Sequence, residues 1–154
     1  MPVRRSVFAA LLCLTLLFAR PALGLVQITG TDDLDFGTWS GGGLSRTLSV
    51  CIYNDAGPNS SYAITAEGEG PGSAFTVHRG SIHVGIDIDW SASGGGWQGL
   101  TPRTRSGIFS GASNVLDCGG GSNASIRFTV NQTDLLNAYA GDYSGLISFE
   151  LVPQ

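Results

Sequence analysis

The segment Ala140–Val152 strongly limits how this chain can fold. After a turn at Ala-Gly-Asp, three apolar residues, Ile147, Phe149 and Leu151, fall on one parity, and polar residues fall between them. Alternation with a period of two is typical of a β-strand that buries one face. Only two residues follow this strand, so we expect the chain to end at the edge of a sheet. Such an edge presents unpaired backbone groups that another strand can fill.

Shorter alternating runs occupy most of the remaining chain. They cover residues 48–53, 62–66, 82–90 and 126–131, and glycine-rich segments separate them. Because the alternation over residues 82–90 is nearly unbroken, we expect a single strand there. Only Thr133–Tyr139 has a pattern that suits a helical turn or two. Short strands at this spacing predict an all-β chain, folded as one β-sandwich domain with a single hydrophobic core.

The N-terminus has the features of a secretory signal peptide. Arg4 and Arg5 precede an apolar run over residues 7–18, and Ala22-Leu-Gly24 supplies small residues for cleavage. A membrane-spanning anchor is the alternative, but the run is about a dozen residues long, whereas a span needs roughly 20. We therefore predict a signal peptide at residues 1–24 and a domain at residues 25–154. The chain would be exported, to the cell surface or as a secreted protein.

The charge of the mature chain narrows the choice of partners. Cleavage would remove three of the eight arginines, leaving five against twelve acidic residues, with no lysine anywhere in the chain. The formal charge would then be −7. An acidic chain without a basic stripe argues against nucleic acid and anionic membranes as partners, and we interpret the charge as favouring solubility.

Of the three cysteines, Cys13 lies in the predicted signal peptide. Cys51 and Cys118 remain as a single pair in an exported chain, the setting in which disulfides persist. Two free thiols, or half of a metal site, are the alternatives, although neither cysteine has a Cys-x-x-Cys companion. We predict that Cys51 and Cys118 form a disulfide.

Two pairs of polar residues have side chains that suit catalysis or metal binding. Asp87 and Asp89 could bind calcium or act as an acid–base pair, and His78 and His83 could act as a base or as metal ligands. In a strand, however, the two aspartates simply point together from the solvent face. No further group in the sequence accompanies the histidines. We expect ordinary surface roles for all four residues.

The remaining motifs do not indicate an enzyme. No serine lies in a Gly-x-Ser-x-Gly or Ser-x-x-Lys motif, and the glycine runs lack phosphate-binding spacing. Trp39, Trp90 and Trp97 could form a sugar-binding platform, although tryptophans in small sandwiches more often pack the core. Glycosylation sequons, which matter only in a host that uses them, occur at Asn59, Asn123 and Asn131. We predict no catalytic residue, metal or cofactor.

Several short motifs occur in a suggestive order. The first half of the chain contains Leu34-Asp-Phe-Gly-Thr38, Leu48-Ser-Val-Cys51 and Tyr62-Ala-Ile-Thr65. The second half contains Ile86-Asp-Ile-Asp-Trp90, Trp97-Gln-Gly99, Ser125-Ile-Arg-Phe-Thr-Val130 and Ala140-Gly-Asp-Tyr-Ser144. In this order they resemble the spore coat protein U domain, the pilin module of archaic (Csu-type) chaperone–usher fimbriae. The Phe-Gly pair and the Ala-Gly-x-Tyr-Ser ending are the most specific parts of a similarity that covers most of residues 26–152.

The resemblance implies an incomplete, immunoglobulin-like β-sandwich, because such pilins lack their last strand. A periplasmic chaperone lends a donor strand to the open groove, and the N-terminal extension of a neighbouring pilin subunit replaces it at the outer-membrane usher. We expect Ile147, Phe149 and Leu151 on the last strand to line one side of this acceptor groove. Val26 and Ile28 on the first strand could line the other side. Main-chain hydrogen bonds would provide affinity, and alternate side chains would set the register.

This chain departs from the family pattern in two respects. The opening stretch, Leu25 to Phe36, lacks the cysteine that many family members carry there, so Cys51 has only Cys118 as a partner. The same stretch is too short to serve both as the first strand and as a donor. We therefore expect a subunit that accepts a strand and sits at the fibre tip. A first strand beginning near Leu34, with Leu25 to Thr31 as a short donor, is the alternative.

The function implied by the resemblance is that of a fimbrial structural subunit that serves adhesion or biofilm formation. Its partners would be a pilus chaperone, an usher, neighbouring pilin subunits and a surface receptor. The alternative is a secreted carbohydrate-binding or adhesive module that binds through Trp97 and neighbouring loops without polymerising.

Overall fold

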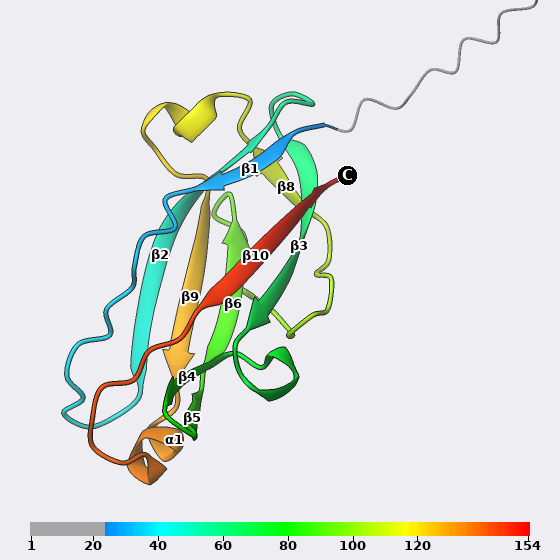
Figure 1. The fold of residues 1–154 in the computed structure, drawn as a ribbon. Helices are drawn as coiled ribbons and strands as arrows, with labels where there is room; N and C mark the ends of the chain where they lie inside the picture. Colours follow the sequence, from blue (N-terminus) through cyan, green and yellow to red (C-terminus); the bar gives the residue numbers. More distant parts are fainter. Residues whose placement is uncertain (1–23) are drawn as a thin grey trace, which may run out of the picture.

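The computed structural model describes residues 24–154, so the predicted signal peptide lies outside the described residues except for Gly24. Strands dominate these residues, as the alternating pattern predicts (Figure 1). They are β1 (Val26–Thr29), β2 (Leu44–Asn54), β3 (Ser60–Gly68), β4 (Thr76–Arg79), β5 (Ile82–Gly85), β6 (Asp87–Ala92), β7 (Gln98–Gly99), β8 (Phe109–Ala112), β9 (Ala124–Val130) and β10 (Ile147–Pro153).

Helical structure is limited to three short elements in the described chain. The helix α1 (Gln132–Asn137) overlaps the segment Thr133–Tyr139, which was expected to form a helical turn, and two 3₁₀ turns are η1 (Pro71–Ser73) and η2 (Leu116–Gly119). None of the helices between residues 24 and 154 has the length and apolar character that a membrane crossing requires.

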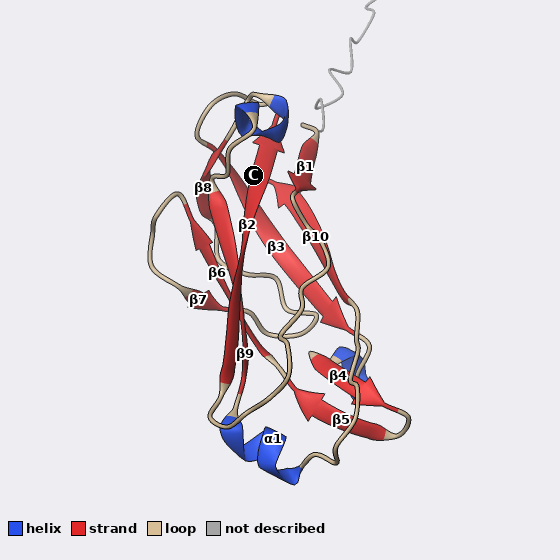
Figure 2. Ribbon diagram, turned by 90° about the vertical axis from the view of Figure 1, so that its left-hand side faces the viewer, coloured by secondary structure: helices blue, strands red, loops and turns tan. Residues whose placement is uncertain are grey.

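Two antiparallel sheets form the body of the molecule and lie face to face (Figure 2). The larger sheet has the strand order β1-β2-β9-β6-β7, and the smaller sheet has the order β10-β3-β8. A separate hairpin of β4 and β5 lies at one end, next to α1. This architecture is in keeping with the predicted β-sandwich.

A single hydrophobic core lies between the sheets, and Trp90 of β6 lies within it with none of its surface exposed. Its ring centroid is 6.2 Å from that of Tyr62, 6.1 Å from that of Phe109 and 6.3 Å from that of Phe149. These separations are typical of favourable aromatic pairs. Because the three partners belong to β3, β8 and β10, Trp90 contacts every strand of the smaller sheet.

The Tyr62 hydroxyl is the polar atom at the centre of this aromatic cluster. It accepts a hydrogen bond from Trp90 Nε1 at 3.3 Å. Burial raises the pKa of Tyr62 to about 12, and the Trp90 hydrogen bond opposes this shift only in part. The hydroxyl therefore stays neutral at physiological pH, as a group inside an apolar core must.

The expectation of one continuous strand over residues 82–90 is wrong, because the chain changes partner at Ile86. β5 pairs with β4, whereas β6 pairs with β9 in the larger sheet. The Ile86 N–H still donates to the Phe75 carbonyl at 2.9 Å, so the hairpin ladder continues up to the change. Ile86 and Ile88 are nevertheless both buried. The alternation thus indicated the buried face correctly but could not reveal the change of sheet.

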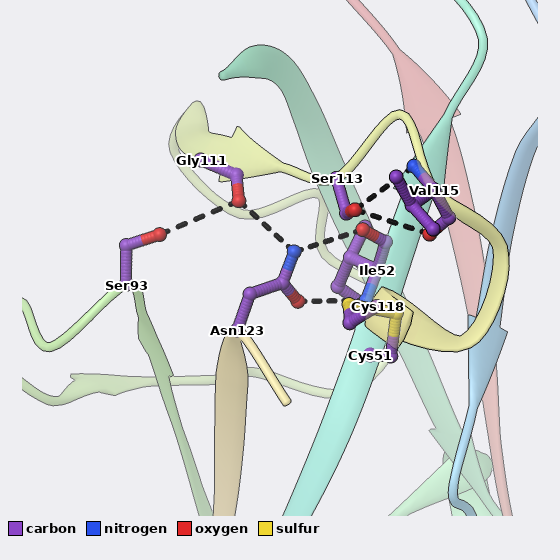
Figure 3. Close-up of a disulfide and its surroundings, with 8 residues drawn as sticks. All are labelled: Cys51, Ile52, Ser93, Gly111, Ser113, Val115, Cys118 and Asn123. Atoms are coloured by element: carbon purple, nitrogen blue, oxygen red, sulfur yellow. Dashed lines mark hydrogen bonds between the residues drawn. A yellow bond between two sulfur atoms is a disulfide. The ribbon is translucent and has the colours of Figure 1, made fainter. Parts of the chain in front are cut away.

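The predicted disulfide between Cys51 and Cys118 is present. It joins β2 to η2 across a sequence separation of 67 residues, with the two Cα atoms 5.7 Å apart (Figure 3). A loop of this length confines the unfolded chain, which stabilises the folded state by about 4 kcal/mol on a chain-entropy estimate. This bond also tethers a loop whose Val115 and Leu116 are exposed.

We predict that replacing both cysteines with serine lowers the free energy of unfolding by about 4 kcal/mol, because the unfolded chain regains its freedom. Denaturant unfolding of the mature protein measures this change. Reduction of the wild-type protein should cause a similar loss, whereas the same reductant should leave the double variant unaffected. Two alkylatable thiols in the native, unreduced protein would contradict the assignment.

A side-chain amide links the two sheets beside the disulfide (Figure 3). Asn123, just before β9, accepts a hydrogen bond from the Ile52 N–H at 2.8 Å through Oδ1. Its Nδ2 donates to the Ile52 carbonyl at 2.9 Å and to the Gly111 carbonyl at 3.0 Å. Ile52 belongs to β2 and Gly111 to β8, so one amide satisfies backbone groups of both sheets.

Because removal of the amide leaves the Ile52 N–H without a partner, we predict that Asn123→Ala lowers the free energy of unfolding by about 1–3 kcal/mol. Asn137→Ala is the matched control, since that exposed side chain bonds only within its own helical turn. The control should change stability by less than about 0.5 kcal/mol. Equal effects of the two substitutions in denaturant titrations would show that Asn123 does not link the sheets.

Candidate functional site

Within residues 24–154, β10 forms one edge of the smaller sheet and pairs only with β3. The register places Phe149 opposite Ala66 and Leu151 opposite Ile64. Just beyond the strand, the Gln154 N–H donates to the Ser61 carbonyl at 3.0 Å. In an antiparallel pair, opposed residues alternate along the ladder. One pair exchanges backbone hydrogen bonds, and the next pair points its backbone N–H and C=O groups away from the partner strand. The pair of Gln154 and Ser61 therefore fixes which residues of β10 point their backbone groups away from β3.

Counting back from Gln154, every second residue bonds to β3, and the residues between them face the open edge. The outward N–H and C=O groups accordingly belong to Ile147, Phe149 and Leu151. These residues also direct their side chains toward the core, against which all three are packed. A strand added at this edge would thus hydrogen-bond to the backbone of the same residues whose apolar side chains lie beneath it.

The first strand has the same arrangement at the edge of the larger sheet. β1 pairs only with β2 among the described residues, and the Asp55 N–H donates to the Leu25 carbonyl at 3.1 Å. The pair of Leu25 and Asp55 is hydrogen-bonded, so Val26 and Ile28 point their backbone groups outward. Both are half-buried and pack against the core. The five residues expected to line the groove therefore share one backbone orientation.

The two edges lie next to each other at one end of the molecule. Parts of β1 and β10 approach to within 8 Å between Cα atoms, near the upper end of β10 in Figure 1. A strand hydrogen-bonded to both edges would hold them about 9.5 Å apart, twice the spacing of neighbouring strands. Along the part of β10 that lies away from β1, the open edge can therefore accept a strand directly. Where β10 lies beside β1, β1 would have to shift before a strand could be inserted.

The segment that leads into β10 is held firmly on β4. The His78 N–H donates to the Ser144 carbonyl at 2.7 Å, and the Ser144 N–H donates to the His78 carbonyl at 3.2 Å. A Cβ at Gly145 would lie only 2.4 Å from the Thr76 carbonyl oxygen, so glycine is required at this crossing. The Tyr143 hydroxyl donates to the Tyr139 carbonyl at 2.9 Å. These contacts fix the start of β10 and hence its register.

The stretch between β1 and β2 contains no strand, although the alternative reading of the sequence placed one near Leu34. Asp35 Oδ1 accepts a hydrogen bond from the Gly37 N–H at 2.7 Å, and Arg46 donates to the Asp35 and Phe36 carbonyls. Leu34 and Phe36 pack against the core. The first strand is therefore Val26–Thr29, and these residues are already paired with β2.

The three tryptophans do not form one platform. Trp90 is fully buried, and Trp39 Nε1 donates to the Gly42 carbonyl at 2.7 Å in the loop before β2. Trp97 is 42% exposed, and the Arg127 guanidinium lies 4.4 Å from its ring centroid. Arg127 also forms an ion pair with Asp89 at 2.9 Å. Trp97 is thus the most exposed of the three rings.

The two aspartates lie on the outer face of the larger sheet, and both have hydrogen-bond partners. Asp87 accepts a hydrogen bond from Asn131 Nδ2 at 2.9 Å, and with Asp89 it borders an open concavity of about 770 Å³ on the larger sheet. Since both carboxylates already have partners, the arrangement gives no sign of an acid–base pair. Among the described residues, no three His, Cys, Asp or Glu side chains gather in one place.

Sequence reasoning missed two features of the site region. Asn123 appeared in the sequence only as a glycosylation sequon, yet its amide is occupied by three hydrogen bonds. His78 and His83 lie directly opposite each other on the β4–β5 hairpin, which the sequence did not reveal. The available signal for that hairpin was a pair of short alternating segments around Val77 and Val84, with the turn residue Gly80 between them.

No protein-family model matches the chain, and no curated protein matches its sequence. The resemblance to the spore coat protein U domain therefore rests on the residues quoted above.

Proposed function

We propose that this protein is a fimbrial structural subunit that is completed by a strand donated from a partner. The observation that supports the proposal is the shared orientation of Ile147, Phe149 and Leu151 on the open edge of β10. Their backbone groups point outward, and their side chains pack against the core. Strand addition at a sheet edge uses this combination, in which main-chain bonds give affinity and alternate side chains give register.

In this proposal, the fold is an immunoglobulin-like sandwich without its last strand. A periplasmic chaperone first occupies the edge, and the outer-membrane usher then exchanges that strand for one from a neighbouring subunit. The disulfide supports the setting, because such bonds persist in exported proteins. The subunit would reach the cell surface as part of a fibre that serves adhesion or biofilm formation.

The edge predicts a specific mutational response. Phe149→Asp places a charge beneath the proposed donor strand, so co-expression with the chaperone encoded by a neighbouring gene should no longer yield a complex. Ser148→Asp is the matched control, because it adds the same charge to the exposed face of the same strand. The control should co-purify with the chaperone at the wild-type yield.

Because Phe149 also packs against Trp90, a second variant tests the outward backbone of β10, with disulfide formation as the check on folding. Leu151→Pro removes an outward N–H while keeping the bonds of β10 to β3, so it should weaken chaperone capture even where the disulfide forms normally. If both variants co-purified at the wild-type yield, the edge would not be the binding site.

We further propose that the subunit lies at the tip of its fibre. The alternating segment nearest the predicted cleavage site, Val26–Thr29, is already paired with β2, so it is not free to act as a donor. Donor-strand polymers are directional, because each subunit fills the edge of its neighbour. A subunit that accepts a strand without donating one fits only at the end.

Immunogold labelling of fibres from the native host tests this placement. We expect antibody against the mature domain to label fibre tips alone. An antibody against a shaft subunit is the control, and it should label along the length. Label for this protein along the shaft would mean that a donor segment exists and that the tip assignment is wrong.

A second candidate function is a secreted carbohydrate-binding module. The exposed Trp97 ring favours it, because an aromatic surface beside the Arg127–Asp89 ion pair offers both stacking and polar contacts to a sugar. Genes for a periplasmic chaperone and an usher beside this gene would favour the fimbrial subunit. Their absence would favour the binding module.

A further inference from the structure

The chain has only two histidines, and the structure brings them together. His78 on β4 and His83 on β5 are directly opposed in the register of the hairpin. Their ring centroids are 5.8 Å apart, with an angle of 37° between the ring planes. Two imidazoles on one face of a hairpin are a potential chelate for a metal ion.

The backbone places this pair at the closest position that an antiparallel ladder offers. The Ile86 N–H donates to the Phe75 carbonyl, which makes that pair hydrogen-bonded. Hydrogen-bonded and non-hydrogen-bonded pairs alternate along the ladder, and His78 and His83 lie three positions from this pair. They therefore form a pair that exchanges no backbone hydrogen bonds. His78 instead exchanges both of its backbone bonds with Ser144 on the other side. Side chains are closer in such pairs, where opposed Cα atoms are about 4.5 Å apart instead of about 5.5 Å.

The ring nitrogens are also available for a ligand. His83 is exposed, and its Nδ1 lies 3.5 Å from the Thr76 hydroxyl, which leaves Nε2 free. His78 Nδ1 is buried and has no hydrogen-bond partner. A buried polar atom without a partner is unusual and needs an explanation. A bound metal ion would provide the missing partner.

We propose that His78 and His83 together bind one divalent late transition-metal ion, with Cu²⁺ held most tightly. Two imidazoles on one ion have ring centres roughly 4.5–5.2 Å apart, since each nitrogen lies about 2.0–2.1 Å from the metal. The two ring centres are 5.8 Å apart, so the exposed His83 side chain would rotate to bring its ring closer when the ion binds. With no third protein ligand among the described residues, water completes the coordination shell. The ion would brace the hairpin on which the segment before β10 rests.

Imidazole nitrogens select among metals in a known order, which gives the proposal a chemical signature. Affinity should rise from Zn²⁺ and Ni²⁺ to Cu²⁺, whereas Mg²⁺ and Ca²⁺, which prefer oxygen ligands, should not bind. The test uses the mature, untagged full-length protein, because a polyhistidine tag would itself bind these ions. Isothermal titration with CuCl₂ should show one ion per chain, and the melting temperature should rise with CuCl₂ concentration.

His83→Asn is the deciding variant, because this exposed side chain can change without disturbing the core. It should weaken Cu²⁺ binding at least about tenfold and abolish the rise in melting temperature, since one imidazole cannot chelate. Ser81→Asn, in the turn of the same hairpin, should bind like the wild type. Copper bound equally by the wild type and His83→Asn, or by neither, would overturn the proposal. Electron paramagnetic resonance should detect two coupled nitrogens in the wild type, and a single nitrogen would also overturn it.

Discussion

The packing of Trp90 is the interaction on which the rest of the structure depends. Its ring lies fully buried on β6 and contacts one aromatic ring from each strand of the smaller sheet. Aromatic residues bury large areas and prefer defined geometries, so this cluster fixes both the separation and the relative position of the sheets. The Asn123 amide and the disulfide then join the sheets and loops at one end.

This core extends to the open edge through Phe149. Its ring contacts Trp90, while its backbone groups face away from β3. A donated strand would therefore cover a residue that is already part of the core, which links completion of the edge to the stability of the whole sandwich. Half-buried apolar side chains at an edge lose stabilisation while they remain exposed to water. In the proposed function, this coupling would give a partner strand a physical reason to bind β10 rather than an arbitrary surface.

The sequence predicted the features that depend on local parity. The alternation around Phe149 identified β10 and its buried face, and two remaining cysteines left one intramolecular pairing. The change of sheet at Ile86 could not be predicted, because it depends on the pairing of β6 with β9, which lies far along the chain. The role of Asn123 was hidden for the same reason. Each depends on which strands become neighbours, and a single sequence does not encode that as a visible pattern.

Hydrogen exchange at the amides of β10 tests the central claim most directly. The N–H groups of Ser148, Glu150 and Val152 bond to β3, whereas those of Ile147, Phe149 and Leu151 face the open edge. In the isolated protein, NMR-detected exchange should thus alternate along the strand, with slow exchange at the first three and fast exchange at the others. Binding of the donor strand should slow exchange at the outward-facing amides. Uniform protection along β10 in the isolated protein would contradict the account, because it would show that the edge is already filled.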